Sequence, residues 1–464
     1  MHLFLILCTI GGNVAAVAGH RPPELRVMTS SGFVNGIYND SAQTVRAFLG
    51  IPYAEPPVQE LRWAPPRPKS PLRRPIDASS FSSPCPQVYS YSNESIYSVL
   101  PSMIWNSGDM SEDCLYLNIW APSFWRRGYR GLRRAAVMMF IHGGSYDTGG
   151  SSVGYYDGTN LVQNQDDLIV VTFNYRLNVF GFPNAPDIDP SKQNLGILDQ
   201  RLAIEWLYEN IARFGGDPDR ILLFGQSAGA SSVDIHSYAY PDDSIVSTLA
   251  LHSGTAPLLT SAPDHQSWNE LSTALGCGPT LGGSNEREVT AFLPLDETPV
   301  DETTISTLSQ KIYNCPLRES MRCRIRLGQH VPTWRYLYHG NFSNVSPTAW
   351  LGAYHGSEMP IVFGTYDTSG AIPPSAREVE VSEYMQGKPS QDKGQALSRL
   401  SNFLGAWVAF AKDPCMGLSE YGWPQFSFDA PTLVNLALNN TVEAIFTSVS
   451  PWDTSCEAPT RSEL

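Results

Sequence analysis

The stretch ILLFGQSAGA, residues 221–230, joins a short apolar run to a serine flanked by glycines. The run has the composition of a buried strand, and the G-x-S-x-G pattern after it is typical of a sharp strand-to-helix turn. Side chains two residues before or after Ser227 would collide in such a turn, which explains Gly225 and Gly229. This context predicts that Ser227 is a nucleophile, the alternative being a plain glycine turn.

Apolar runs of strand length recur along the chain, each followed by a glycine-rich turn or a helical pattern. Such alternation is typical of a mostly parallel sheet covered by helices. Apolar residues recur at helical spacing in residues 199–214 and 397–410, and the proline-rich residues 50–57 are expected to form a loop. The sequence therefore predicts an α/β fold with a doubly wound sheet. The predicted strands include residues 136–141, 168–173, 221–224, 247–251 and 331–338.

A pair of glycines follows the predicted strand 136–141, upstream of the serine motif. Small residues at such a place let backbone N–H groups converge on the negative oxygen of a tetrahedral intermediate, and each donor contributes about 3 kcal/mol to its stabilisation. We expect the N–H groups of Gly144, Ser145 and Ala228 to form this oxyanion hole, with Gly143 supporting the turn. The alternative is a glycine pair that merely ends a strand.

The general base is expected in the loop GAYHGSEMP, residues 352–360, which follows the predicted strand 331–338. A histidine that must reach a nucleophile over the edge of a sheet belongs on such a loop, later in the chain than the serine. His355 is therefore the predicted base, although a single histidine can also be structural. His355 and Glu358 have the spacing of a metal pair but lack a third ligand, so no metal and no organic cofactor are expected.

The charge of the chain disfavours nucleic acid as a partner. Asp and Glu number 45 against 31 Lys and Arg, which gives a net charge of −14, and no basic run occurs. The chain has 464 residues, of which 42% are hydrophobic, so it can bury a large core.

Residues 1–18 resemble a secretory signal peptide, because an apolar core at residues 3–10 precedes small residues that end at Ala18. A buried N-terminal strand is the alternative. No later apolar stretch is long enough to span a membrane. We therefore expect a secreted protein, and five N-x-S/T triplets are candidate glycosylation sites: Asn39, Asn93, Asn341, Asn344 and Asn439.

The eight cysteines are scattered singly, without the spacing of a zinc site. Disulfides are the better interpretation and agree with export. Removing Cys8 with the signal peptide leaves an odd number, so at least one cysteine is expected to lack a partner within the chain.

Six motifs are distributed over most of the chain: GIPYAEPP at 50–57, SEDCLYLN at 111–118, FNYR at 173–176, NLGILDQ at 194–200, GQSAGA at 225–230 and GAYH at 352–355. Together they resemble signatures of the type B carboxylesterase/cholinesterase family, and Gln226 resembles the form often found in its secreted fungal members. The resemblance implies the α/β-hydrolase fold in one domain, residues 19–464, with a Ser-Glu-His triad, a deep gorge and a disulfide between Cys85 and Cys114.

The resemblance also implies which carboxylate completes the triad. The family's acid lies five residues after a glycine and four before a phenylalanine, and Glu288 has Gly283 and Phe292 at those offsets. Val289 stands where the family usually has glycine. Glu286 is the nearest competitor, or else a surface charge.

The interval between Ser227 and Glu288 is shorter than in the family, where several helices that wall the gorge occupy it. The break falls between Cys277 and Pro279, and the usual disulfide partner of such a cysteine is missing with it. A splice variant or a faulty gene model would explain this apparent deletion, which would leave apolar surface uncovered.

The expected reaction is hydrolysis of a small neutral carboxylic ester or an acylglycerol through an acyl-enzyme. Trp105 lies near the position of the choline-binding tryptophan of cholinesterases, but Gln226 replaces their glutamate beside the nucleophile, which disfavours cationic substrates. Two alternatives stay open: a non-catalytic binding or adhesion protein on the same scaffold, and a defective truncated product.

Overall fold

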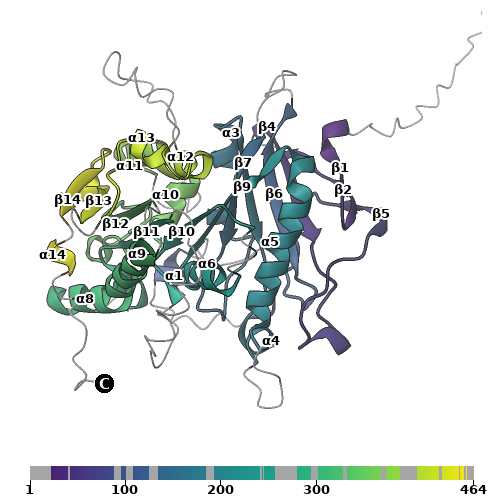
Figure 1. Cartoon of the computed structure of the whole chain (residues 1–464), viewed down its shortest axis with the longest axis horizontal. Coiled ribbons are helices and arrows are strands. Elements are labelled where there is room, and N and C mark those ends of the chain that lie inside the picture. Colours follow the sequence, from purple (N-terminus) through teal and green to yellow (C-terminus); the bar gives the residue numbers. More distant parts are fainter. Residues whose placement is uncertain are drawn as a thin grey trace, which may run out of the picture.

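The computed structural model describes residues 22–39, 42–87, 96–100, 108–124, 134–183, 193–240, 243, 245–256, 280–293, 301–327, 332–366, 373–386, 405–427, 431–448, 450–453 and 456. Within these residues the strands form an 11-stranded sheet and a 3-stranded sheet. The large sheet runs through β14 (Ile445–Ser448), β13 (Thr432–Leu436), β12 (Thr333–Tyr338), β11 (Thr280–Asn285), β10 (Thr248–His252), β9 (Gly216–Gln226), β7 (Ala135–Ile141), β8 (Leu168–Phe173), β6 (Tyr116–Pro122), β4 (Ala42–Pro52) and β3 (Ile37–Asn39). The small sheet contains β1 (Arg26–Thr29), β2 (Gly32–Asn35) and β5 (Leu72–Asp77), on the right of Figure 1.

Neighbouring strands from β13 to β8 pair in parallel. Strand β14 at one edge and strands β6, β4 and β3 at the other pair antiparallel. The carboxyl ends of the parallel strands therefore lie along one edge of the sheet, where ligands of open α/β sheets bind.

The central strands are buried on both faces. Along β7, Met138 and Phe140 belong to one hydrophobic cluster, whereas Val137 and Met139 belong to another. Successive side chains of a strand point to opposite faces, so the two clusters lie on opposite sides of the sheet.

Helices cover both clusters, which confirms the predicted doubly wound α/β sheet (Figure 1). On the first side lie α3 (Thr159–Gln163), α10 (Met359–Phe363), α11 (Ala376–Gln386) and α12 (Ala406–Lys412). On the second side lie α5 (Leu195–Phe214) and α6 (Ala228–Ala239). The remaining described helices are α1 (Ile96–Val99), α4 (Asn178–Gly181), α8 (Glu302–Ser309), α9 (Cys315–Leu327), α13 (Gly417–Glu420) and α14 (Ser450–Asp453).

Several boundaries differ from the sequence prediction. Strand β9 begins earlier, at Gly216, and α5 begins at Leu195. The prediction of a loop over residues 50–57 is wrong at its start, because β4 continues to Pro52. A change of register between Phe48 and Ile51, with a φ of 75° at Gly50, lets the strand pass this point as a bulge.

Strand β11 has no clear signal in the sequence, because it contains two adjacent glycines. Its neighbours explain them. A Cβ atom on Gly282 would lie 1.8 Å from the Met321 side chain of α9, and one on Gly283 would lie 2.2 Å from the Tyr336 ring of β12. The glycines weaken the strand locally, but they allow α9 and Tyr336 to pack directly against it.

A buried ion pair links the end of β8 to α5. Arg176 donates from Nε and Nη2 to the two carboxylate oxygens of Asp199, at 2.8 Å each, and both side chains are almost fully buried. Arg176 also donates from Nη1 to the backbone oxygen of Ala64 at 2.9 Å. The pair therefore connects three distant segments of the chain.

We expect Asp199→Asn to lower the free energy of unfolding by about 3–5 kcal/mol, because it leaves the buried Arg176 charge uncompensated. The exposed Arg377–Glu380 pair supplies the control, and Glu380→Gln should cost less than about 1 kcal/mol. Urea denaturation with intact disulfides measures both values. Equal losses in the two variants would contradict this prediction.

Two disulfides are present among the described residues. Cys85 is bonded to Cys114, the pair that the family resemblance implies, and Cys315 of α9 is bonded to Cys456. Cys415 is exposed and free. Cys277 lies outside the described residues, as do residues 1–18, Trp105 and the apparent deletion near residues 277–279.

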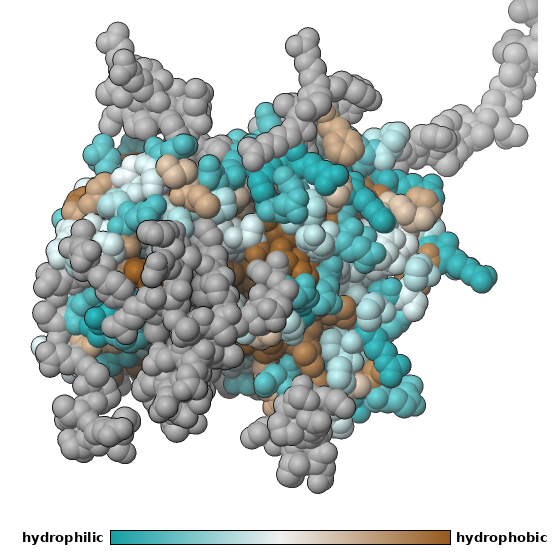
Figure 2. Space-filling view, viewed as in Figure 1, coloured by the Kyte–Doolittle hydropathy of each residue, from teal (hydrophilic) through white to brown (hydrophobic). Residues whose placement is uncertain are grey.

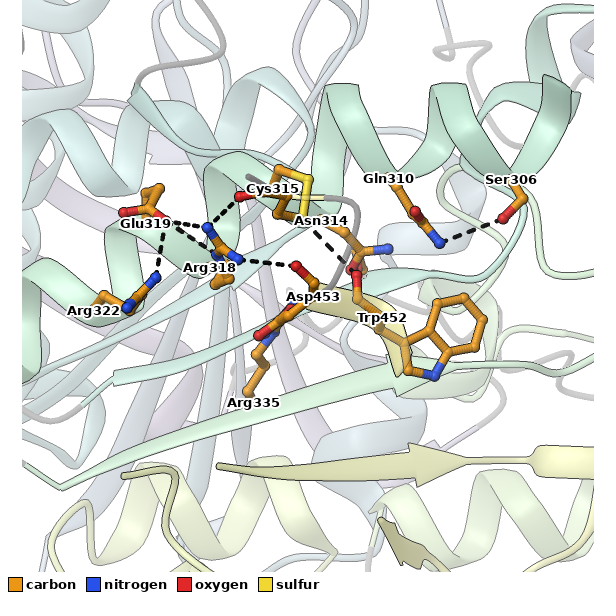
Figure 3. Close-up of a disulfide and its surroundings, with 12 residues drawn as sticks. Ser306, Gln310, Asn314, Cys315, Arg318, Glu319, Arg322, Arg335, Trp452 and Asp453 are labelled. Atoms are coloured by element: carbon orange, nitrogen blue, oxygen red, sulfur yellow. Dashed lines mark hydrogen bonds and ion pairs between the residues drawn. A yellow bond between two sulfur atoms is a disulfide. The ribbon is translucent and has the colours of Figure 1, made fainter. Parts of the chain in front are cut away.

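The second disulfide joins α9 to Cys456, just after α14 in the chain, and polar contacts of α14 with α9 and β12 lie beside it (Figure 3). Arg335 of β12 donates from Nη1 to the Asp453 carboxylate at 2.9 Å, and Arg318 of α9 donates to the Asp453 backbone oxygen at 3.0 Å. Charge pairing and a covalent bond thus anchor the same short helix.

None of the helices that the structure describes is long and apolar enough to cross a bilayer.

Candidate active site

Ser227 lies on the turn that the motif predicts, between the end of β9 and the start of α6. Its φ of 57° and ψ of −124° are unusual for a residue with a side chain, and such strain concentrates at functional sites. Its N–H donates to the backbone oxygen of His252, at the end of β10, at 2.8 Å. The strained turn is therefore supported by the neighbouring strand.

The glycines around Ser227 are required by close backbone approaches. A Cβ on Gly225 would lie 2.4 Å from the backbone of Gly229, and one on Gly229 would lie 2.0 Å from the oxygen of Ile141. A Cβ on Gly254 would lie 2.1 Å from the oxygen of Ser227. Any larger residue at these positions would push the turn away from the sheet.

His355 and Glu288 form a hydrogen-bonded pair beside this turn. Nδ1 of His355 lies 2.7 Å from Oε2 of Glu288, and both side chains are buried. The other carboxylate oxygen accepts the backbone N–H of Asn285 at 2.6 Å. The His355 N–H also donates to the backbone oxygen of Glu288 at 3.3 Å, so backbone and side chains hold the two loops together.

The competing carboxylate, Glu286, lies elsewhere. Its Oε2 is 3.0 Å from Nδ1 of His339, and its side chain is 39% exposed. Val289 is accommodated because it lies in a short 3-10 helix, η7 (Glu288–Phe292), where its N–H faces the Ser309 hydroxyl at 3.4 Å. A glycine is therefore not required at this position.

The hydrogen bond to Glu288 determines the tautomer of His355. An ionised carboxylate can only accept a hydrogen bond, so Nδ1 carries the proton and Nε2 carries the lone pair that a base needs. The Nε2 atom of the Gln226 amide lies 3.1 Å from this nitrogen. The described part of the chain contains no hydrogen bond between the Ser227 hydroxyl and His355.

The loop after β7, which carries two of the three predicted oxyanion donors, has an unusual backbone. Gly144, Ser145 and Tyr146 have φ angles of 107°, 56° and 62°, and the first two line the same cavity as Ser227 and His355. Ala228 is the first residue of α6, where a backbone N–H has no partner within the helix. The three predicted donors thus lie on the two segments that flank Ser227.

Several contacts hold residues 142–149, which we call the oxyanion loop after their predicted role. The N–H groups of Asp147 and Thr148 donate to the oxygen of Gly144 at 2.9 and 3.0 Å. Gln87 exchanges two hydrogen bonds of 2.8 Å with the backbone of Gly149 and donates to the oxygen of Cys85 at 3.0 Å. The disulfide loop therefore supports the oxyanion loop.

Residues that the sequence analysis did not assign to the site form a buried network behind the pair. The Asn285 side chain donates to the oxygen of Tyr354 at 2.6 Å and to Oε2 of Glu358. Burial, with a further contribution from the nearby Glu288 charge, raises the pKa of Glu358 to about 8. In the sequence, this network could have been suspected from two features. Asn285 is a polar residue within β11, and Glu358 is a carboxyl three residues after His355.

This raised pKa predicts a pH dependence of stability. Between about pH 4.5 and pH 8 the folded chain keeps the proton on Glu358 and the unfolded chain releases it, so stability falls as pH rises through this window. We expect Glu358→Gln to remove roughly 2–5 kcal/mol of that loss between pH 5 and pH 8. Thermal or urea unfolding at both pH values measures it, and parallel pH profiles for the two proteins would contradict it.

A second buried network supports the turn from β10. Trp407 donates from Nε1 to Nε2 of His252 at 3.0 Å, and the Tyr336 hydroxyl lies 2.6 Å from Nδ1. Because Nε2 accepts, Nδ1 carries the proton and the ring is neutral; burial lowers the pKa of His252 to about 3. The strand residue that accepts the Ser227 N–H is thus locked in place.

The cavity in front of Ser227 is small and without formal charge. Its volume is about 80 Å³, and no Asp, Glu, Lys or Arg is among its described lining residues. The rings of Phe292 and Tyr313 lie 5.5 and 4.8 Å from that of His355. The lining residues are Tyr97, Gly143, Gly144, Ser145, Thr148, Gly149, Val153, Tyr155, Tyr156, Gln226, Ser227, Phe292, His355, Gly356 and Met359.

A wider groove lies behind the oxyanion loop. It has a volume of about 820 Å³ and is lined mainly by α4, α5 and α6, with Ser145 and Tyr146 at its edge. Figure 2 shows hydrophobic residues gathered over this part of the surface. Because Ser145 lines both hollows, the loop that carries it separates them.

Among the described side chains there is no cluster of three or more potential metal ligands.

Known proteins are similar to this chain in sequence and in fold. Residues 23–299 match the profile of the family described as the carboxylesterase family. The chain is 35% identical to chlorogenic acid esterase of Aspergillus niger, over 89% of this chain and 90% of that protein. It is 31% identical to secreted lipase 5 of Gibberella zeae, over 93% and 94%.

Among solved structures, a PNB esterase superposes with a TM-score of 0.73 at 23% identity, covering 94% of this chain and all of that one. This likeness shows the α/β-hydrolase fold. Because the profile match covers more than half of the chain and both fungal relatives align over most of it, the chain belongs to the carboxylesterase family of serine ester hydrolases.

Proposed function

We propose that the protein hydrolyses small neutral carboxylic esters, with Ser227 as nucleophile, His355 as general base and Glu288 as the acid that orients it. One observation carries this assignment: His355, which is hydrogen-bonded to Glu288, and the strained Ser227 line one cavity together with Gly144 and Ser145. The reaction needs no metal or organic cofactor.

In the first half of the reaction, Ser227 attacks the ester carbonyl and its proton passes to Nε2 of His355. The N–H groups of Gly144, Ser145 and Ala228 stabilise the resulting oxyanion, and Glu288 stabilises the imidazolium. The bond to the alcohol breaks, and His355 returns the proton to the leaving oxygen.

In the second half, His355 takes a proton from water, which attacks the acyl-enzyme. The tetrahedral intermediate collapses, the acid leaves, and the proton returns to Ser227. The same three residues therefore serve both halves, as in other acyl-enzyme hydrolases.

The preference for a neutral ester rests on the lining of the cavity. A cationic substrate gains from a nearby carboxylate, and Gln226 supplies a neutral amide next to Ser227. Val153, Met359 and several aromatic side chains also line the cavity, which suits an apolar acyl or alcohol group. Acylglycerols belong to the same class of neutral esters.

Of the alternatives that the sequence left open, the binding or adhesion protein finds less support. A binding or adhesion protein needs no strained serine beside a hydrogen-bonded Glu–His pair, and both fungal relatives are named as an esterase and a lipase. The alignment with the Aspergillus enzyme spans 489 positions, more than this chain has residues, although only 89% of the chain takes part. That excess supports our inference that the chain lacks a segment its relatives have, within one domain of residues 19–464.

A direct test compares four esters in purified protein: p-nitrophenyl acetate and butyrate, acetylthiocholine, and its neutral carbon analogue 3,3-dimethylbutyl thioacetate. We expect hydrolysis of the first two, and kcat/KM for the neutral thioester at least equal to that for the cation. A fluorophosphonate probe followed by peptide mass spectrometry should add its mass to Ser227. No hydrolysis and no label in folded protein would reject the function.

We further propose that the protein is secreted and N-glycosylated. The candidate glycosylation sites differ in solvent exposure. Asn341 and Asn439 are exposed, whereas Asn344 is buried and its side chain donates to the backbone oxygen of Tyr366 at 2.7 Å. Asn39 is half-buried and donates to Thr159 at 2.8 Å, and Asn93 lies outside the described residues. Among the four candidates that the structure describes, a large sugar can be accommodated at the exposed pair.

We expect the full chain, expressed in a fungal host, to appear in the medium without residues 1–18 and with glycans at Asn341 and Asn439. Enzymatic glycan release in ¹⁸O-water, followed by peptide sequencing, marks each occupied asparagine. A mark at Asn344, or none at either exposed site in secreted protein, would contradict this prediction.

A further inference from the structure

The side-chain amide of Gln226 is hydrogen-bonded to Nε2 of His355, the nitrogen that accepts the proton in the proposed reaction. Gln226 is the last residue of β9, directly before Ser227, and its side chain is buried. Its Nε2 atom lies 3.1 Å from Nε2 of His355. Because the Nδ1 proton of His355 is used by Glu288, the amide donates its hydrogen to the Nε2 lone pair.

The surrounding backbone holds this amide in place. A Cβ on Gly143 would lie 2.7 Å from Oε1 of Gln226 and 2.9 Å from Cβ of Ser227. A Cβ on Gly356, on the opposite loop, would lie 3.3 Å from Nε2 of Gln226. The side chain therefore fits between the oxyanion loop and the His355 loop, and glycine on both sides makes room for it.

A neutral imidazole has one lone pair at Nε2, which accepts one well-aligned hydrogen bond. The Ser227 hydroxyl and the Gln226 amide therefore compete for it. In this structure the amide holds it, and no hydrogen bond joins the Ser227 hydroxyl to His355 among the described residues. The nucleophile is not yet activated.

We propose that Gln226 is a positioning residue that caps His355 Nε2 in the substrate-free enzyme and gives up this nitrogen when an ester fills the cavity. The proposal rests on the function proposed above and adds a step before acylation. The cap keeps a buried nitrogen satisfied and the ring oriented, because an unpaired buried polar atom is costly. A bound ester displaces the amide from the shared cavity and leaves Ser227 as the donor.

If Gln226 caps Nε2 in this way, removing the amide should affect small reagents and cavity-filling substrates differently. A small reagent that does not fill the cavity, such as methanesulfonyl fluoride, must react while the amide still competes with Ser227. A seated substrate has already displaced the amide, so steps after binding should be insensitive to it. Removing the donor should therefore accelerate the first kind of reaction and leave kcat of the second largely unchanged.

Gln226→Met keeps the length of the side chain and removes the donor, whereas Gln226→Asn keeps an amide that is too short to reach. We expect both variants to react with methanesulfonyl fluoride about 2- to 10-fold faster than the parent, the range of one ordinary hydrogen bond. For p-nitrophenyl butyrate, KM should fall and kcat should change by less than about 2-fold.

Nitrogen-15 NMR of histidine-labelled protein gives a readout that does not depend on activity. The His355 Nε2 resonance, assigned with His355→Gln, should move downfield in Ser227→Ala/Gln226→Met relative to Ser227→Ala, because without the serine hydroxyl no second donor replaces the amide. Met359→Leu, which changes packing in the same cavity without a polar contact, should leave it in place.

An Nε2 resonance that is the same in Ser227→Ala and Ser227→Ala/Gln226→Met, or slower sulfonylation together with a lower kcat in Gln226→Met, would overturn the cap. Failure of the function looks different, because the parent itself would then resist both the sulfonyl fluoride and the fluorophosphonate probe. An active parent with unaltered Gln226 variants rejects the cap alone.

Discussion

Ser227→Ala is expected to lower kcat/KM for p-nitrophenyl butyrate by at least about 10⁴-fold, because it removes the atom that forms the acyl-enzyme. The oxyanion donors and the cavity would remain, so binding and a small residual activity above the uncatalysed rate should survive. The hydroxyl makes no hydrogen bond to His355 in this structure, and its removal should therefore change the free energy of unfolding little.

Ser237→Ala is the matched control for this prediction. Ser237 lies on α6, the helix that begins after Ser227, and its hydroxyl donates to the backbone oxygen of Asp234 at 2.6 Å. We expect its activity to stay within about 2-fold of the parent, since surface substitutions are usually mild. Retention of more than a few per cent activity in folded Ser227→Ala would identify a different nucleophile.

Glu288→Gln is expected to lower kcat by about 10³- to 10⁴-fold with little change in KM. An amide can donate to Nδ1 of His355, which places the proton on Nε2 and removes the lone pair that accepts from Ser227. The carboxylate also stabilises the imidazolium, and a neutral amide does not. Both effects act on the transition state, so they appear in kcat.

The competing carboxylate supplies the control for this second prediction. Glu286→Gln removes a charge two residues away that contacts His339 rather than His355, and we expect less than about a 2-fold change. Steady-state kinetics at neutral pH, with circular dichroism to confirm folding, distinguish the two variants. A larger loss in Glu286→Gln than in Glu288→Gln would reverse the assignment of the acid.

The double variant Ser227→Ala/Glu288→Gln should be no less active than Ser227→Ala alone. Residues that act as one catalytic unit are not additive, because the second loss has no function left to remove. Two independent losses would show that Glu288 acts on a step that does not involve Ser227.

Local steric requirements made much of the protein predictable from its sequence. The turn at Ser227 needs glycine at fixed offsets and a strand before it, so the residues next to Ser227 in the sequence were enough to predict it. The apolar runs that became β7, β8, β9, β10 and β12 are buried on both faces, and continuous apolar composition is their signal. Glu288 was named through family spacing, and no local pattern around it distinguished it from Glu286.

Only the tertiary structure decided which side chains meet. Glu288 reaches His355, whereas Glu286 reaches His339, because the two carboxylates leave the β11–η7 turn in different directions. The bond between Gln226 and His355, the buried Glu358 and the Cys315–Cys456 disulfide join segments far apart in the chain. Such contacts depend on how several strands and loops are placed together, and the order of residues along a single segment carries no record of that placement.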